Sequence, residues 1–190
     1  MRKGNLFVLS GPSGVGKGTV LERLLENYDG IDFSTSVTTR GRRPGEVEGK
    51  DYFFISVEDF FQMVEEKKFI EWAEVHNNYY GTPKEYVKKA LERGKDIILD
   101  IDIQGASVVN KMYPEAIFVF LVPPSLSELE SRLDKRGTED KNSKEVRLKN
   151  ARDELAEINK YDYQIVNDKL DETVKVLKAI IIAEKHKIRK

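Results

Sequence analysis

A short stretch near the amino terminus combines glycines with one lysine in the spacing of a phosphate-binding loop. Residues 11–17 match the pattern GxxxxGK. Glycines let the backbone curl so that successive N–H groups point at one phosphate, and Lys17 can reach the phosphates beyond it. A glycine-rich surface turn would show the same letters. The residues expected around the nucleotide phosphates are Gly11, Pro12, Ser13, Gly14, Val15, Gly16, Lys17, Gly18 and Thr19.

The elements that flank this loop favour the phosphate-binding interpretation. Residues 6–9 form a continuous apolar run, which is typical of a strand buried on both faces. A helix is expected from about residue 16 to residue 27. A phosphate loop requires this order of strand, loop and helix.

The loop departs from the general pattern at one position that concerns a metal ion. Gly18 follows Lys17, where the pattern has a serine or threonine whose hydroxyl binds Mg²⁺. Either Thr19 takes that role, or nucleotide oxygens and water hold most of the ion, which dehydrates reluctantly. Asp100, at the end of the predicted strand 96–100, could orient such a water. We favour the water-mediated contact.

Composition limits the class of protein. The 190 residues suffice for one substantial core with a small insertion. The net charge of −1 argues against binding nucleic acid or an anionic membrane through bulk electrostatics. Cysteine is absent, which excludes disulfides and thiolate metal sites and fits a cytoplasmic location. The apolar run near the amino terminus is too short for a signal peptide or a membrane span. The sequence leaves open whether the chain is a monomer or a homo-oligomer.

Further strand candidates alternate with helical segments along the rest of the chain. They are residues 97–99, 117–121 and 165–166, and a final helix is expected over 171–188. This alternation predicts an α/β fold with a parallel sheet covered by helices on both faces. We assign residues 1–33 and 89–190 to this core.

Residues 34–88 interrupt the alternation and are interpreted as an inserted subdomain. Turn signals and aromatic residues are frequent there. Ser56 is expected to cap a short helix whose apolar residues Phe60, Phe61, Val64 and Phe69 face inward, and residues 69–75 suit a strand. A second unusual segment, at about 134–150, is densely charged and resembles a lid.

The chain resembles the guanylate kinase family over nearly its full length. The segments that carry the resemblance occur in the family's order: 11–19, 36–40, 43–46, 49–52, 69–73, 79–82, 99–105, 136–139 and 166–168. The resemblance implies a P-loop NTPase core of three layers, an inserted GMP-binding subdomain and a helical lid. It also implies a nucleoside monophosphate kinase that transfers the γ-phosphoryl group of ATP to GMP, and to dGMP, in purine nucleotide metabolism.

The resemblance assigns the acceptor nucleotide to the insertion. Guanine has two N–H donors, which the family reads with carboxylates at the positions of Glu71 and Asp102, while Ser36 and Thr82 lie near its O6. The residues implied at the acceptor phosphate are Arg40, Arg43, Tyr52 and Tyr80. Taken singly, each has a simpler interpretation: a solvated turn for the arginines, subdomain core for the tyrosines and a surface ion pair for Glu71.

The resemblance also assigns residues to the donor nucleotide and to catalysis. Arg132, Arg136 and Arg147 match the family's lid arginines, and Asn167 matches a position beside the adenine of ATP. Arg132 could instead pair with acidic residues on its own helix, and Asn167 could be a turn residue. The residues expected to stabilise the transferred phosphoryl group are Lys17, Arg40, Arg136 and Arg147.

Two alternatives compete with this interpretation. One is a non-catalytic interaction module with the same fold, which usually lacks a working phosphate loop. The other is a kinase for another nucleoside monophosphate or a sugar phosphate, with the same donor site. Glu71 and Asp102, which suit the donors of guanine, argue against the second alternative.

Overall fold

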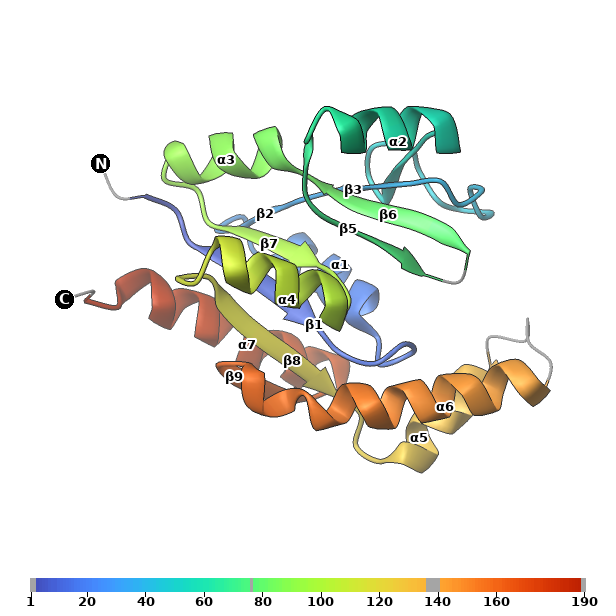
Figure 1. Ribbon diagram of the computed structural model, residues 1–190. Coiled ribbons are helices and arrows are strands. Elements are labelled where there is room, and N and C mark those ends of the chain that lie inside the picture. Colours follow the sequence, from blue (N-terminus) through green and yellow to red (C-terminus); the bar gives the residue numbers. More distant parts are fainter. Residues whose placement is uncertain (1–2, 76, 136–140, 189–190) are drawn as a thin grey trace.

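Two β-sheets and the helices around them make up the protein (Figure 1). The computed structural model describes residues 3–75, 77–135 and 141–188, and it describes side chains in these ranges outside residues 133–148. The larger sheet has the strand order β2-β7-β1-β8-β9, and all of its pairings are parallel. Its strands are β1 (Leu6–Ser10), β2 (Asp32–Phe33), β7 (Ile97–Asp100), β8 (Ile117–Val122) and β9 (Tyr163–Val166).

The four strands expected from apolar runs are therefore confirmed, and the parallel α/β fold with them. The fifth strand, β2, was not predicted. It has two residues and pairs with β7 at the edge of the sheet, so it lacks the apolar run that marks the other strands.

Helices cover both faces of the larger sheet (Figure 1). Phe7 and Leu9 point to a core shared with α1 (Lys17–Asn27) and α7 (Leu170–His186). Leu6 and Val8 point to a second core on the opposite face, shared with α3 (Lys84–Glu92) and α4 (Ile103–Met112). Alternate residues of β1 are buried on opposite faces, as expected for a strand in the middle of a covered sheet.

The smaller sheet belongs to the segment predicted as an insertion. It has the order β4-β3-β6-β5. Its elements are β3 (Ser36–Thr38), β4 (Tyr52–Phe54), β5 (Phe69–Val75), β6 (Asn78–Pro83) and the covering helix α2 (Val57–Glu65). Ser56 caps α2 by accepting a hydrogen bond from the Asp59 N–H, as predicted. Phe60 is fully buried, but the prediction for Phe61 was wrong, because its side chain lies at the surface with 37% exposure.

The predicted end of the inserted subdomain falls within a helix, and the predicted lid segment overlaps two helices. Residue 88 lies within α3, whose buried Val87, Ala90 and Leu91 pack in the core of the larger sheet. The segment 134–150 contains the end of α5 (Leu126–Lys135) and most of α6 (Lys141–Ala156), which extend from the carboxyl end of β8 (Figure 1). A 3₁₀ turn, Ile158–Lys160, connects α6 to β9.

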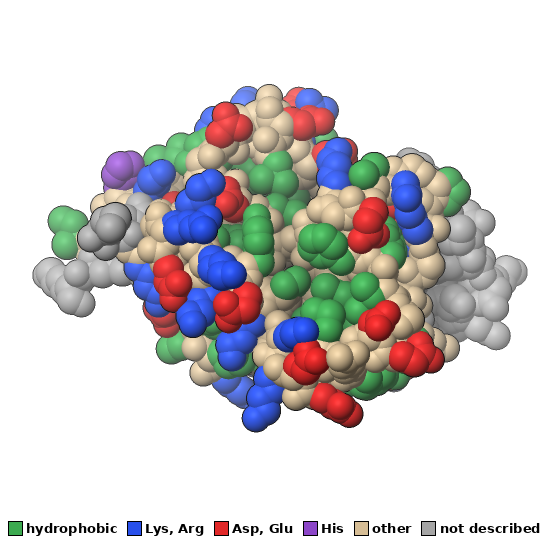
Figure 2. Space-filling model, turned by 90° about the horizontal axis from the view of Figure 1, so that it is seen from above, with side chains coloured by type: hydrophobic (Ala, Val, Ile, Leu, Met, Phe, Trp, Pro, Cys, Tyr) green, Lys and Arg blue, Asp and Glu red, His purple; other side chains and the backbone are tan. Residues whose placement is uncertain are grey.

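The surface carries mixed charge. On the face shown in Figure 2, basic and acidic side chains of the described residues are interspersed. Among the described residues, no helix is long and apolar enough to cross a membrane.

Candidate active site

The loop between β1 and α1 has the backbone geometry that its glycines predict. Gly11, Gly14 and Gly16 have φ values of 147°, 85° and 98°, which residues other than glycine rarely adopt. A Cβ atom on Gly11 would lie 2.4 Å from the Leu121 carbonyl oxygen of the neighbouring strand β8. The loop therefore needs glycine both for its conformation and for its close approach to the sheet.

Lys17 begins α1 and returns toward the loop. Its Nζ donates a hydrogen bond of 2.9 Å to the Gly11 carbonyl and lies 4.0 Å from Asp100 Oδ1. Burial raises the pKa of Asp100, and the positive charge of Lys17 opposes this shift. The carboxyl end of β7 thus presents an oxygen ligand beside the phosphate loop.

Two side chains from distant parts of the sequence fix the back of the loop. Asn167 is buried, and its amide Nδ2 donates a 2.7 Å hydrogen bond to the Val15 carbonyl. Arg132 donates to the carbonyls of Val15 and Asn167, at 3.4 Å and 3.1 Å. Arg132 also pairs with Glu128 on its own helix at 2.9 Å, which is the pairing that its helical spacing suggested.

A cavity of about 420 Å³ opens in front of the phosphate loop, and we call it the central cavity. Its walls come from the loop, the smaller sheet, the carboxyl end of β7 and helix α6. The residues that line it include Gly11, Ser13, Lys17, Ser36, Tyr52, Glu71, Tyr80, Asp100, Asp102, Asn150 and Glu154. The structure thus brings the predicted phosphate loop and most of the predicted acceptor residues to one space.

Glu71 lies in β5 with only 6% exposure. The Thr82 hydroxyl of β6 donates a hydrogen bond of 2.5 Å to its Oε1. Burial raises the pKa of Glu71 to about 7, while the bond from Thr82 opposes the shift and the charge of Asp102 adds to it. The alternative of a surface ion pair is therefore wrong for this carboxylate.

The amino-terminal end of α4 packs directly against Glu71. A Cβ atom on Gly105 would lie 2.6 Å from Glu71 Oε2, so a side chain at this position would require the carboxylate to shift. Asp102 caps this helix, since its Oδ1 accepts a 2.8 Å hydrogen bond from the Gly105 N–H. Asp102 therefore has a structural role that the sequence did not suggest, in addition to its place in the cavity wall.

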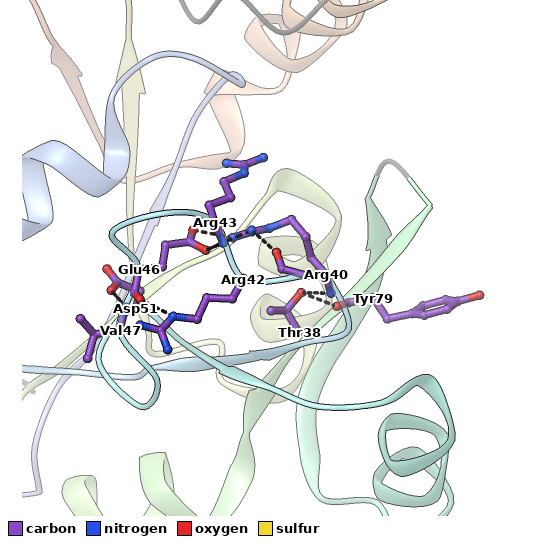
Figure 3. A network of polar contacts seen from close by, with 9 residues as sticks. Thr38, Arg40, Arg42, Arg43, Glu46, Val47, Asp51 and Tyr79 are labelled. Atoms are coloured by element: carbon purple, nitrogen blue, oxygen red, sulfur yellow. Dashed lines mark hydrogen bonds and ion pairs between the residues drawn. The ribbon is translucent and has the colours of Figure 1, made fainter.

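Arg40 is held by a carboxylate to which the sequence had given no role. Its two terminal nitrogens donate to Glu46, with Nη1–Oε2 at 3.1 Å and Nη2–Oε1 at 2.6 Å (Figure 3). The Arg40 guanidinium also lies over the Tyr52 ring, 5.4 Å from its centre. The turn Arg43-Pro44-Gly45 reverses the chain direction so that Glu46 faces Arg40. In the sequence, these turn residues were the feature that could have indicated a contact between Glu46 and Arg40.

Several predicted residues lie apart from the central cavity. Thr19 is exposed on α1 and lines neither the central cavity nor a second cavity of about 440 Å³ between α1 and Tyr52. Arg43 donates its backbone N–H to Glu46, and its guanidinium extends away from that carboxylate (Figure 3). Arg136 lies outside the described residues, as does the side chain of Arg147 in α6. The described residues hold no group of three or more His, Asp or Glu side chains that could bind a metal.

A parallel sheet with a phosphate loop after its central strand, facing a subdomain with a buried carboxylate, defines a P-loop kinase fold. The family model described as guanylate kinase matches residues 3–184. The chain belongs to the guanylate kinase family.

Similar proteins agree with this assignment. A guanylate kinase of Caldanaerobacter subterraneus subsp. tengcongensis is 50% identical over 187 residues, which cover 98% of this chain and 91% of the relative. A guanylate kinase of Clostridium tetani is 50% identical over 188 residues, which cover 99% of this chain and 90% of the relative. The crystal structure of guanylate kinase from Anaplasma phagocytophilum superposes with a TM-score of 0.83 at 38% identity, covering 98% of this chain and 88% of that one.

Proposed function

We propose that this chain transfers the γ-phosphoryl group of ATP to GMP, and to dGMP, giving ADP and GDP. One observation carries the proposal: the phosphate loop with Lys17 and the buried carboxylate of Glu71 line the same cavity. The loop suits a nucleoside triphosphate, and the carboxylate suits a base with neighbouring N–H donors. The two substrates would then meet with the transferred group between them.

Guanine recognition is assigned to Glu71 with help from its neighbours. The carboxylate would accept hydrogen bonds from N1–H and N2–H₂ of guanine, while Asp102 lies nearby in the same wall. The buried Ser36 supplies a hydroxyl for O6. Thr82, whose one hydroxyl hydrogen is donated to Glu71, would turn it to O6 when guanine binds. Adenine would turn its N1 acceptor toward Glu71 and leave a buried carboxylate without a donor, which discriminates strongly between substrates.

The acceptor phosphate is assigned to cations and hydroxyls at the edge of the smaller sheet. Arg40 is positioned by Glu46, and Tyr52 and Tyr80 line the central cavity. A guanidinium fork suits a phosphate dianion because it can donate two parallel hydrogen bonds. Arg43 would join this group by turning its exposed side chain toward the phosphate.

The donor ATP is assigned to the loop 11–19, with Arg132 and Asn167 behind it. Phosphoryl transfer has a loose transition state, so catalysis depends on positioning and on stabilising negative charge. Lys17 and Arg40 supply positive charge from the donor and acceptor sides. Arg136 and Arg147 would add to it from the segment 134–150, which we propose closes as a lid and excludes water.

The residues present fit a magnesium ion bound mainly through water. Asp100 offers a hard carboxylate oxygen at the wall of the central cavity, whereas Thr19 lines neither cavity. Bound Mg²⁺ neutralises charge on the phosphate oxygens. Asp100 would orient a water of its hydration shell. A cytoplasmic location is also part of the proposal and is supported by the absence of cysteine.

Replacing Glu71 tests the acceptor site. In Glu71→Gln we expect kcat/KM for GMP to fall about a hundredfold, because an amide cannot accept both guanine donors, while the Kd of ATP stays within about twofold. Glu65→Gln is the matched control, since Glu65 is exposed on α2 of the same subdomain. Equal losses for GMP and ATP would show that Glu71 only supports the fold.

A further inference from the structure

Helix α6 brings an acidic side chain into contact with the phosphate loop. Glu154, near the carboxyl end of the helix, faces the Ser13 backbone N–H across the central cavity, and that N–H lowers the pKa of the carboxyl group. Both residues line the central cavity together with Lys17. The Glu154 carboxylate oxygen Oε2 is buried and has no hydrogen-bond partner among the described residues.

This contact has the chemistry of an anion in a phosphate loop. The N–H groups of such a loop are donors for phosphate oxygens, and a carboxylate that faces the Ser13 N–H lies where a phosphate oxygen would be expected. Lys17 attracts Glu154 electrostatically, although its Nζ donates to the Gly11 carbonyl. Glu154 therefore uses part of the loop's capacity to bind negative charge.

Further negative groups surround this carboxylate. Burial raises the pKa of Glu154, and the charge of Asp102, at the amino-terminal end of α4, adds to this shift, while Lys17 and the Ser13 N–H oppose it. Tyr161, which follows the 3₁₀ turn after α6, lies close enough for Glu154 to contribute to its raised pKa. A donor triphosphate would add several negative charges to a space that already holds Glu154, Asp100 and Asp102. Repulsion between Glu154 and the donor phosphates would therefore weaken donor binding.

We propose that Glu154 competes with the donor phosphates for the phosphate loop and must withdraw, with the end of α6, when the triphosphate binds. This inference rests on the proposed donor site at residues 11–19. Withdrawal would couple donor binding to the position of α6, which carries Arg147 of the predicted lid. Glu154 is thus a positioning residue that lowers donor affinity.

The test compares ATP binding by the full chain and by two variants in a calorimetric titration. Glu154→Gln keeps an oxygen for the Ser13 N–H but removes the charge, so ATP should bind about three- to tenfold more tightly. Asp153→Asn is the matched control, because Asp153 is exposed on the same helix and the change in charge is identical. This control should bind ATP within about twofold of the parent.

A second probe separates charge from general loosening of the cavity. Inorganic tripolyphosphate has no base, so its affinity should rise by a similar factor in Glu154→Gln if the carboxylate competes for the phosphate loop itself. If the glutamine variant folds poorly, Glu154→Ala replaces it in the test. This variant removes both the charge and the acceptor, and it should show the same gain in affinity. Unchanged or weaker ATP binding in a folded variant, or an equal gain in Asp153→Asn, would overturn the inference. A parent protein that binds no ATP would instead reject the donor site.

Discussion

Glu46 accepts hydrogen bonds from both terminal nitrogens of Arg40, at 3.1 Å and 2.6 Å. The side chain of Glu46 is only 18% exposed and that of Arg40 only 12%. The same carboxylate accepts the Arg43 backbone N–H at 2.7 Å. A fork held on one side by a carboxylate loses little freedom when it binds a phosphate on the other. Glu46 is therefore expected to act through Arg40 on the acceptor nucleotide.

Removing the charge of Glu46 should weaken the acceptor site. For Glu46→Gln we predict a roughly tenfold rise in KM for GMP, because charged hydrogen bonds that position Arg40 are lost. The KM for ATP should change less than about twofold. Steady-state kinetics with each substrate varied in turn checks this, with Glu65→Gln as the control. A parallel rise in both KM values would contradict a specific role for Glu46 at the acceptor site.

The buried Glu71 should make stability depend on pH. Burial raises its pKa to about 7 from an ordinary value of 4.5, so the folded protein binds more protons than the unfolded chain between these values. Its contribution to stability is therefore fully present below about pH 4.5 and is lost as pH rises through about 7, with a total of about 3 kcal/mol. Glu71→Gln removes this dependence.

Thermal unfolding without nucleotides measures the effect. The Tm of Glu71→Gln minus that of the parent should increase from pH 5 to about pH 7 and then level off toward pH 8. The corresponding difference for Glu65→Gln should stay constant, since Glu65 is exposed. A Tm difference for Glu71→Gln that does not change with pH would show that the buried carboxylate titrates normally.

The proposed magnesium site predicts that replacing Asp100 and replacing Thr19 change the magnesium dependence of the rate to different extents. If Asp100 orients water on the ion, Asp100→Asn should raise the Mg²⁺ concentration for half-maximal rate about tenfold, since outer-shell partners affect metal affinity on this scale. Thr19→Val should shift it much less. A magnesium titration at saturating ATP and GMP distinguishes the two. A larger shift in Thr19→Val than in Asp100→Asn would make the hydroxyl the ligand.

Strong local patterns predicted much of the fold. The apolar run of β1, followed by glycines and a helix, placed the phosphate loop, and Ser56 placed the start of α2. Weak local patterns failed: β2 has two residues, and Phe61 is exposed although its neighbour Phe60 is fully buried. Tertiary packing decides such positions, and a short window of sequence does not contain it.

Residue types indicated the candidate site, but their supporting contacts needed the structure. The chemistry of a carboxylate and of a lysine was enough to predict the proposed roles of Glu71 in guanine binding and of Lys17 in phosphate binding. The roles of Glu46, Gly105 and Glu154 depend on neighbours 6, 34 and 141 positions away in sequence, namely Arg40, Glu71 and Ser13. Contacts of the last two kinds arise only when the sheet and its insertion have folded.

Acceptor specificity tests the central claim most directly. Purified protein with ATP and Mg²⁺ is assayed for ADP formation against GMP, AMP, CMP and UMP. We predict a kcat/KM for GMP at least about a thousandfold above that for each of the others, because only guanine supplies the donors that Glu71 requires. Preference for another acceptor would contradict base recognition by Glu71 and Asp102. Absence of transfer to any acceptor would contradict the kinase assignment and favour a binding module.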